Sequence, residues 1–232
     1  MKKHVALFFM VPIMALLSLL AGCEQQKQTA SAPQQQPVYA GTIVAVGDSL
    51  TAGQGVSENN AYPAQLERTL REGGYNWQVI NAGISGETSS GTLSRINWVL
   101  KLKPDIVILE TGANDGMRGI DPAVTRKNID ETVRILKENH VLVVLAGMKM
   151  FTNLGRSYTN AFGALYPAVA NKHGLILIPF FLEGVAGDPA LNQGDGIHPI
   201  AEGYRIIIGR IEPYVHQAIR EAEKVKKGRV EK

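Results

Sequence analysis

The sequence predicts an α/β fold: a three-layer α/β/α sandwich whose flavodoxin-like parallel sheet has five strands in the order 2-1-3-4-5. Two observations lead to this prediction. Short β-branched runs alternate with segments long enough for helices, and the runs lack the polar alternation of a half-solvated strand. Such runs are typical of parallel strands covered by helices on both faces, where functional groups gather on the loops beyond the carboxyl ends of the strands.

Five apolar runs are the expected strands, and the long segments that follow them are the expected helices. The first helix has Pro63 in its opening turn, and the third has Asp121 as its expected N-cap with Pro122 at the first helical position. The strands are "TIVAV" at 42–46, "WQVIN" at 77–81, "DIVIL" at 105–109, "VLVVLA" at 141–146 and "LILI" at 175–178, and the helices span about 60–73, 88–101, 121–138, 157–173 and 199–219.

The first 22 residues have the pattern of a signal peptide. Two lysines precede about 16 largely apolar residues, a stretch too short for a membrane-spanning helix. The sequence "LAGC" ends at Cys23 and resembles the lipobox of bacterial lipoproteins, which implies lipidation of this cysteine, the only one in the chain. We therefore expect an exported protein, lipid-anchored to a bacterial membrane and facing the periplasm or the cell exterior, on the outer membrane if the cell is Gram-negative. The alternative is an ordinary secretory signal with an incidental cysteine.

The rest of the chain is expected to hold one folded domain between two accessory segments. Residues 23–40 carry the cysteine and a glutamine- and proline-rich stretch that we interpret as a flexible tether. Residues 41–219 form the expected domain, and residues 220–232 form a charged C-terminal tail. The formal net charge is +3 and includes two lysines of the signal segment, so the charge balance predicts no nucleic-acid partner.

The loops after the expected strands combine glycine with polar side chains. Glycine allows tight turns and brings backbone N–H groups close to a ligand, although loop glycines alone are equally compatible with simple turns. Each loop also carries a hydroxyl, amide, carboxyl or imidazole group, so the set predicts a polar site at this edge of the sheet. The four loops are "GDSLTAGQG", "NAGISGETS", "ETGANDGMRG" and "GDGIHP".

Three of these side chains can form a hydrolytic triad. Asp195 and His198 are three positions apart, so the carboxylate can reach the imidazole and fix its tautomer. A serine hydroxyl needs such a base to become a nucleophile, and Ser49 follows the first strand. Taken singly, Ser49 could be a helix N-cap and His198 a surface or core histidine. Asp48 is expected to hold the turn by accepting backbone N–H bonds.

Acyl transfer also requires hydrogen-bond donors for the oxyanion of the tetrahedral intermediate. The candidates are the backbone N–H groups of Ser49 and Gly83 and the side-chain amide of Asn114. Asn114 could instead brace its own turn.

Four segments together resemble the blocks of the SGNH (GDSL) hydrolases: "GDSL" at 47–50, Gly83 in "NAGISGET", "GAND" at 112–115 and "DGIHP" at 195–199. The local sequence is similar to that of bacterial arylesterases and of the multifunctional acyl-CoA thioesterase I/lysophospholipase L1 subgroup. The resemblance implies the same roles for Ser49, Gly83, Asn114, Asp195 and His198. Thr51 stands where the "GxSxG" elbow of α/β-hydrolases has glycine, so that fold is not predicted. The lipobox and tether are a departure from most relatives of this subgroup, which are commonly soluble periplasmic proteins.

We therefore expect a serine esterase that cleaves carboxylic esters, and also thioesters or lysophospholipids, through an acyl-serine intermediate. No metal or cofactor is expected. Its partners would be a small ester or acyl-lipid substrate and the membrane, and the protein would be a monomer. Four apolar residues could line an acyl groove, or could equally serve core or rim packing, and the loop 147–157 is a candidate lid. The four are Ile84, Met117, Phe151 and Leu154.

Three alternatives remain open. The same catalytic residues could remove O-acetyl groups from glycans. A flavodoxin-like binding protein could cradle phosphate with its first glycine loop, but it would have no use for Asp195 and His198. A surface adhesin with a degenerate site would not need complete catalytic loops.

Overall fold

The computed structural model of the protein describes residues 38–230, with side chains described through residue 228. The predicted signal segment, Cys23 and most of the tether lie outside the described residues. Within residues 38–230, no helix is both long enough and apolar enough to cross a bilayer.

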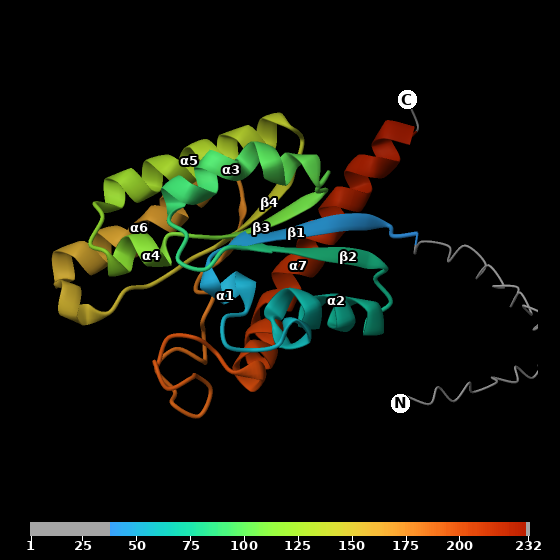
Figure 1. Ribbon diagram of the computed structural model, residues 1–232. Helices are drawn as coiled ribbons and strands as arrows, with labels where there is room; N and C mark the ends of the chain where they lie inside the picture. The colour runs from blue at the N-terminus through green and yellow to red at the C-terminus, as the bar shows by residue number, and fades with distance from the viewer. Residues whose placement is uncertain (1–37, 231–232) are drawn as a thin grey trace, which may run out of the picture. The chain divides into compact units, whose positions relative to one another are not determined.

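Five parallel strands form one sheet in the order β2-β1-β3-β4-β5, which confirms the predicted fold and strand order (Figure 1). The central strands β1 and β3 pair in register from Ile43 opposite Ile106 to Val46 opposite Leu109. The strands are β1 (Gly41–Gly47), β2 (Trp77–Gly83), β3 (Ile106–Glu110), β4 (Leu142–Ala146) and β5 (Ile176–Ile178).

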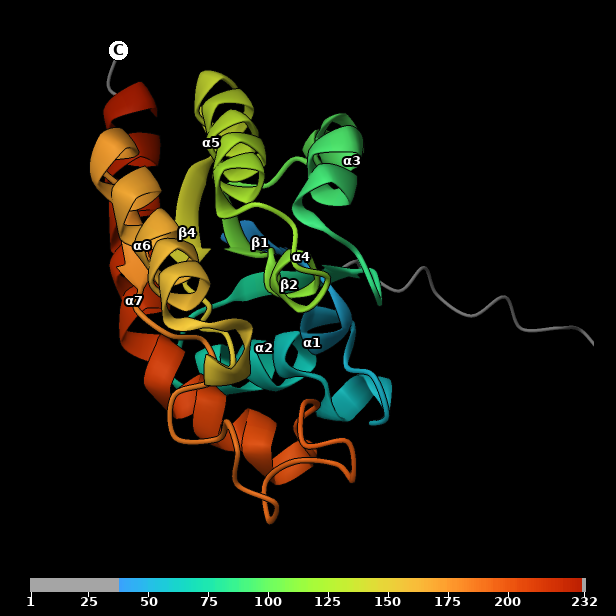
Figure 2. The ribbon, with the colours of Figure 1, turned by 90° about the vertical axis from the view of Figure 1, so that its left-hand side faces the viewer.

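Helices cover both faces of this sheet. Helices α3, α5 and α6 pack on one face, and α2 and α7 pack on the other (Figures 1 and 2). The long helices are α2 (Tyr62–Glu72), α3 (Ser89–Lys101), α5 (Pro122–Glu138), α6 (Arg156–His173) and α7 (Ala201–Val230). The short ones are α1 (Ser49–Ala52), α4 (Ala113–Met117) and the 3-10 turns η1 (Glu58–Asn60) and η2 (Thr152–Leu154).

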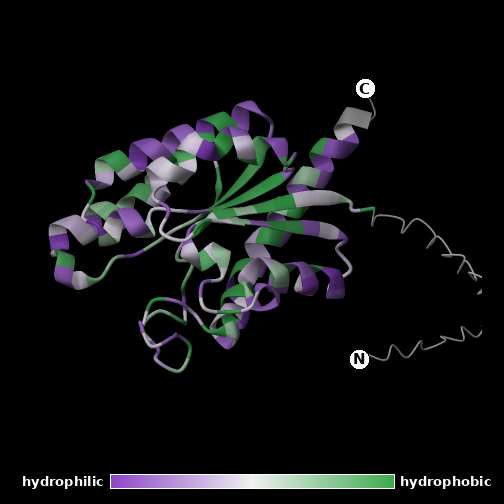
Figure 3. Ribbon diagram, viewed as in Figure 1, coloured by the Kyte–Doolittle hydropathy of each residue, from purple (hydrophilic) through white to green (hydrophobic). Residues whose placement is uncertain are grey.

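The core lies between the sheet and these two helical layers. All five residues of β3 are fully buried, as expected of a strand covered on both faces. Figure 3 shows the hydrophobic strands at the centre and the hydrophilic residues on the outward faces of the helices. Aromatic pairs such as Phe162 and Tyr166, which meet edge to face at 5.7 Å, fill the space between helix and sheet.

The helix termini confirm one local prediction and correct another. Asp121 caps α5 by accepting a hydrogen bond from the N–H of Ala123 at 2.8 Å, with Pro122 at the first position. Residues 220–230, which the sequence places in a charged tail, instead continue α7. The segment is rich in strong helix formers, and Lys226 fixes it to the sheet by its ion pair with Asp105 and its position over the ring of Trp77.

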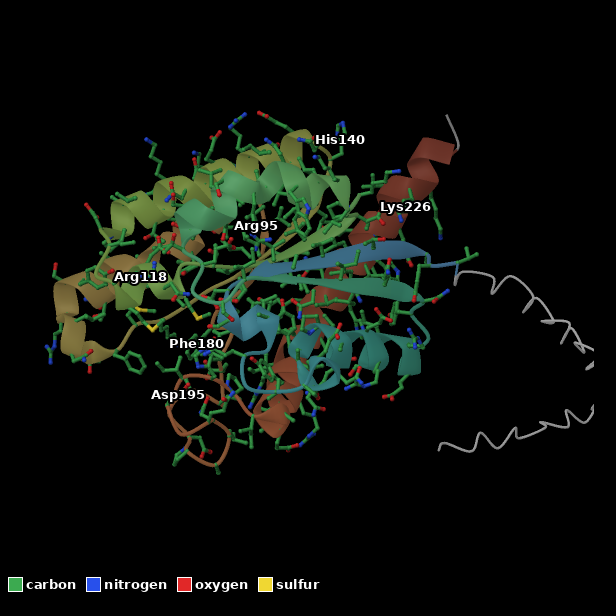
Figure 4. All side chains as sticks on the ribbon, viewed as in Figure 1. Arg95, Arg118, His140, Phe180, Asp195 and Lys226 are labelled. Atoms are coloured by element: carbon green, nitrogen blue, oxygen red, sulfur yellow. The ribbon has the colours of Figure 1, made fainter. Side chains whose placement is uncertain are left out.

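The two ends of the sheet differ in character. The carboxyl ends of the strands lead into α1, α4 and the loop that contains Asp195, as Figures 1 and 4 show. Phe180 also lies at this end, whereas His140 and Lys226 lie at the opposite end (Figure 4). The polar loops singled out in the sequence thus converge at one edge of the sheet.

Candidate active site

Ser49 is displayed at the end of β1 by a short helix. The chain leaves the strand at Gly47, and Asp48 caps α1 by accepting a hydrogen bond of 3.0 Å from the N–H of Leu50. Ser49 is the first residue of this helix and is 7% exposed. Among the hydrogen bonds of residues 38–230, its own N–H has no partner. The turn therefore presents both a hydroxyl and a free backbone donor.

The structure brings Ser49, His198 and Asp195 together in one hydrogen-bonded chain. The Nε2 atom of His198 lies 2.8 Å from the Ser49 hydroxyl oxygen, and the Nδ1 atom lies 2.6 Å from Oδ2 of Asp195. The other carboxylate oxygen of Asp195 accepts the N–H groups of Ile197 and His198 at 2.8 and 3.0 Å. This geometry is that of a nucleophile, a base and an acid that orients the base.

Asp195 is held as a carboxylate by these partners. The hydrogen bond to the His198 side chain, followed by the two backbone N–H groups, lowers the pKa of Asp195 to about 2. A charged Asp195 keeps the ring proton of His198 on Nδ1, so that Nε2 can accept the proton of Ser49.

The loop that carries His198 is anchored to the segment after α1. The N–H of Gln193 donates to the carbonyl of His198 at 2.8 Å, and its side-chain amide donates to the carbonyl of Gln54 at 2.7 Å. From α7, the Tyr204 hydroxyl donates to the carbonyl of Leu50 at 2.9 Å. These bonds connect the last loop and the last helix to the turn that presents Ser49.

Asn114 lies in the first turn of α4 and is oriented by Asp48. Its side-chain amide donates to Oδ2 of Asp48 at 3.0 Å, and its side chain is largely buried. Asp48 therefore holds its turn through a backbone N–H, as predicted, and also fixes a neighbouring side chain. The amide nitrogen of Asn114 carries a second hydrogen that this contact does not use.

Gly83 has a different role from the predicted one. Its N–H donates to the side-chain oxygen of Asn81 at 2.9 Å and is therefore already engaged. A Cβ at Gly83 would lie only 2.2 Å from the backbone nitrogen of Ala52, so glycine is needed there for α1 to approach β2. The hydrogen bonding does not support Gly83 as an oxyanion donor, and this corrects the sequence assignment.

Gly86, in the same loop, is a candidate donor that was not predicted from the sequence. Its backbone is left-handed with φ +78°, and its N–H has no partner among the hydrogen bonds of the described residues. Its carbonyl accepts a hydrogen bond of 2.8 Å from Arg118, which directly follows α4. The second glycine of "NAGISGETS" was the available signal, but spacing alone could not distinguish it from the first.

An apolar cavity of about 290 Å³ opens beside the triad. Leu50 and Ile197, the neighbours of Ser49 and His198, line it, together with Met117 from α4 and two methionines from the loop after β4. Of the four residues predicted to line an acyl groove, Met117 and Phe151 do so, whereas Ile84 and Leu154 are outside the lining. A groove of about 630 Å³ between α5 and α6 contains none of the triad residues.

Comparisons with known proteins show the family to which the chain belongs. Residues 45–206 match the GDSL-like lipase/acylhydrolase family. "Esterase TesA" of Pseudomonas aeruginosa is 39% identical over 182 residues, covering 78% of this chain and 88% of that protein. "Thioesterase 1/protease 1/lysophospholipase L1" of Escherichia coli strain K12 is 38% identical over 165 residues, covering 69% and 76%. A crystal structure of TesA superposes with a TM-score of 0.74 at 36% identity, covering 76% of this chain and 99% of that one. The chain belongs to the GDSL-like lipase/acylhydrolase family, the SGNH hydrolases.

Proposed function

We propose that this esterase cleaves its substrates with Ser49 as the nucleophile, His198 as the general base and Asp195 as the residue that orients the base and stabilises its protonated form. The observation that carries the proposal is the continuous hydrogen-bonded chain from the Ser49 hydroxyl through both ring nitrogens of His198 to the Asp195 carboxylate. Ser49 stands 146 positions before Asp195 and still further before His198, so the arrangement depends on the whole fold.

The reaction proceeds in two acyl-transfer steps. Nε2 of His198 accepts the proton of Ser49 as the serine oxygen bonds to the carbonyl carbon of the ester. The resulting tetrahedral intermediate collapses when the protonated His198 gives this proton to the leaving alcohol, which leaves an acyl-serine. A water molecule then gives a proton to His198 and attacks the acyl carbon, and collapse of the second intermediate releases the carboxylic acid and restores Ser49.

The oxyanion of both intermediates is held by donors from three neighbouring segments. The free N–H of Ser49 and the second hydrogen of the Asn114 amide are the first two. The N–H of Gly86 replaces that of Gly83 as the third, because its N–H is unengaged and its loop is tied to the end of α4 through Arg118. Fixed donors of this kind stabilise negative charge without reorganising during the reaction.

The substrate class follows from the cavity. Its lining is mostly apolar, with the side chains of Met117, Met148 and Met150 around one acyl-sized space beside the nucleophile. Methionine adapts to chains of different length because its side chain is flexible and polarizable. The protein therefore acts on esters, and also on thioesters or lysophospholipids, whose acyl chain enters this cavity. The names of the Pseudomonas and Escherichia relatives support this range.

The proposal includes a membrane anchor and a monomeric state. "LAGC" supports diacylglyceryl modification of Cys23 and export to the outer surface of a bacterial membrane. The triad and the cavity are complete within one chain, so no second copy is needed for activity.

Expression of wild-type and Cys23→Ser protein with labelled palmitate tests the anchor: label and membrane fractionation should be lost in the variant. Retention of both would contradict lipidation at Cys23.

Hydrolysis of p-nitrophenyl esters from acetate to dodecanoate tests the enzymatic part. The purified protein should cleave the longer esters at least as well as acetate, and Ser49→Ala should abolish cleavage of all of them. Full activity in Ser49→Ala would contradict the nucleophile. A strict preference for acetate would contradict the acyl cavity and favour a glycan O-acetyl esterase.

A further inference from the structure

A carboxyl group with no part in the reaction lies directly beneath the nucleophile. Glu110, the last residue of β3, is fully buried, although a glutamate at a strand end is ordinarily solvated. Its Oε2 atom accepts a hydrogen bond of 2.9 Å from the Thr51 hydroxyl and one of 3.3 Å from the N–H of Asp48. These two donors are the neighbours on either side of the Ser49–Leu50 pair. The carboxyl group therefore joins the start of the nucleophile turn to its far side.

The space around this contact is filled. A Cβ at Gly47 would lie 2.1 Å from the Thr51 hydroxyl oxygen and 2.5 Å from Oε2 of Glu110, so the turn closes tightly over the carboxyl group. The second oxygen, Oε1, is buried and has no partner among the described residues. Leaving a polar atom unpaired in the core costs stability, so a purely structural use of this position would favour an apolar side chain.

We propose that Glu110 is a positioning residue of the hydrolytic site, whose carboxyl group holds the Asp48 N–H and the Thr51 hydroxyl so that the Ser49 side chain and N–H keep their reactive orientation. The inference rests on the hydrolase function proposed above. Glu110 does not touch the substrate, and it acts only through the turn from Asp48 to Thr51.

Glu110 does this in its protonated form. Burial first, and then the nearby charge of Asp48, raise the pKa of Glu110 well above its ordinary value. Burial also raises the pKa of Asp48, but Asp48 is compensated by the N–H of Leu50 and the amide of Asn114. Two adjacent buried carboxyls hold one proton between them, and Glu110, with weaker compensation, keeps it. Among the described residues, the hydroxyls of Tyr62, Tyr166 and Tyr204 also face Glu110, and burial raises the pKa of each above its ordinary value.

A pair of substitutions at Glu110 tests the positioning role. Glu110→Leu removes the acceptor, and we expect kcat to fall by about ten- to one hundred-fold with KM nearly unchanged, since a small displacement of a nucleophile has effects of this size. Glu110→Gln keeps a carbonyl acceptor and should recover most of this loss. An unchanged kcat in Glu110→Leu would overturn the proposal, as would an equal loss in both variants.

Thr51 supplies a second pair in case Glu110→Leu fails to fold. Thr51→Val keeps the shape of the side chain but removes the hydroxyl donor, whereas Thr51→Ser keeps the donor. We expect kcat to fall in Thr51→Val and to be largely restored in Thr51→Ser. Equal kcat values in the two variants would overturn the proposal. Ser49→Ala distinguishes a failure of the proposed function from a failure of the positioning role. If Ser49→Ala is inactive while the Glu110 and Thr51 variants match the wild type, only the positioning role is wrong.

The pH dependence of stability gives a readout that a charged, structural glutamate would not produce. The folded protein keeps its proton on Glu110, whereas the unfolded chain loses it above the ordinary pKa of 4.5. The unfolding equilibrium constant should therefore rise with pH by up to about ten-fold per pH unit above that value, until Glu110 ionises in the fold. Glu110→Gln lacks this slope, so its stability relative to the wild type should increase between pH 5 and pH 8. A difference that is constant over this range would overturn the protonated state.

Discussion

The side-chain amide of Asn114 donates a 3.0 Å hydrogen bond to the carboxylate of Asp48, the residue that precedes Ser49. One bond thus connects α4, which follows β3, to the turn that follows β1. Because β1 and β3 are neighbours in the sheet, their carboxyl ends place the nucleophile and an oxyanion donor side by side. Asp48 is in this way the link between the two halves of the acyl-transfer site.

Asn114→Ala is expected to lower kcat by about 10²–10³, the usual effect of removing one oxyanion donor, with a much smaller change in KM. The matched control is Asn160→Ala, which removes the same amide from an exposed position on α6. Steady-state kinetics on one p-nitrophenyl ester distinguish the two. Equal kcat values for Asn114→Ala and the wild type would exclude Asn114 from the oxyanion site.

Asp195→Asn is expected to lower kcat by about 10²–10⁴, because a neutral amide can favour the wrong tautomer of His198. Asp188→Asn, an exposed change in the same loop, should retain activity. If Asp195→Asn and Asp188→Asn gave the same kcat, the orienting role of Asp195 would be refuted.

The pKa of Asp195 also predicts a dependence of stability on acid. Its folded value of about 2 lies below its ordinary value of 3.8, so its contribution to stability is complete above pH 4 and is lost as the pH falls toward 2. Thermal melts between pH 2 and pH 5 should show this acid-dependent component in the wild type and its absence in Asp195→Asn. The same slope in both proteins would contradict the lowered pKa.

Gly83→Ala tests the corrected role of this glycine. The new methyl group would meet the Ala52 backbone at 2.2 Å, and such overpacking typically costs about 1–3 kcal/mol. Gly163→Ala on α6 meets nothing within 4 Å and should be neutral or stabilising, by up to about 1 kcal/mol. Denaturant unfolding measures both. A stable, fully folded Gly83→Ala protein would show that α1 does not need this close approach.

The sequence predicted the strands well because the apolar runs of the central strands β1, β3 and β4 are almost wholly buried on both faces and leave a clear local signal. It did not predict the buried position of Glu110, since a glutamate that ends an apolar run has the same local pattern whether or not a helix later covers it. The choice between Gly83 and Gly86 likewise depended on where Asn81 and Arg118 place their side chains. The triad was predictable because Ser49 follows the first strand and Asp195 and His198 stand three positions apart. The α4 link between Asp48 and Asn114 was not predictable.

Ala186→Phe is expected to narrow the apolar cavity that Ala186 lines. Each buried methylene contributes about 0.8 kcal/mol, so kcat/KM should fall steeply for long acyl esters and little for acetate. Ala161→Phe, in the groove between α5 and α6, is the control and should not alter chain-length preference. An unchanged profile in Ala186→Phe would show that the acyl chain binds elsewhere.

Covalent labelling with an alkyl fluorophosphonate, which reacts with activated serines, followed by mass spectrometry of the peptides, tests Ser49 as the nucleophile most directly. We expect one adduct, on Ser49, that forms in parallel with the loss of ester hydrolysis and is absent from Ser49→Ala and strongly slowed in His198→Ala. Inactivation with the adduct on another residue, or full activity in labelled protein, would contradict Ser49 as the nucleophile.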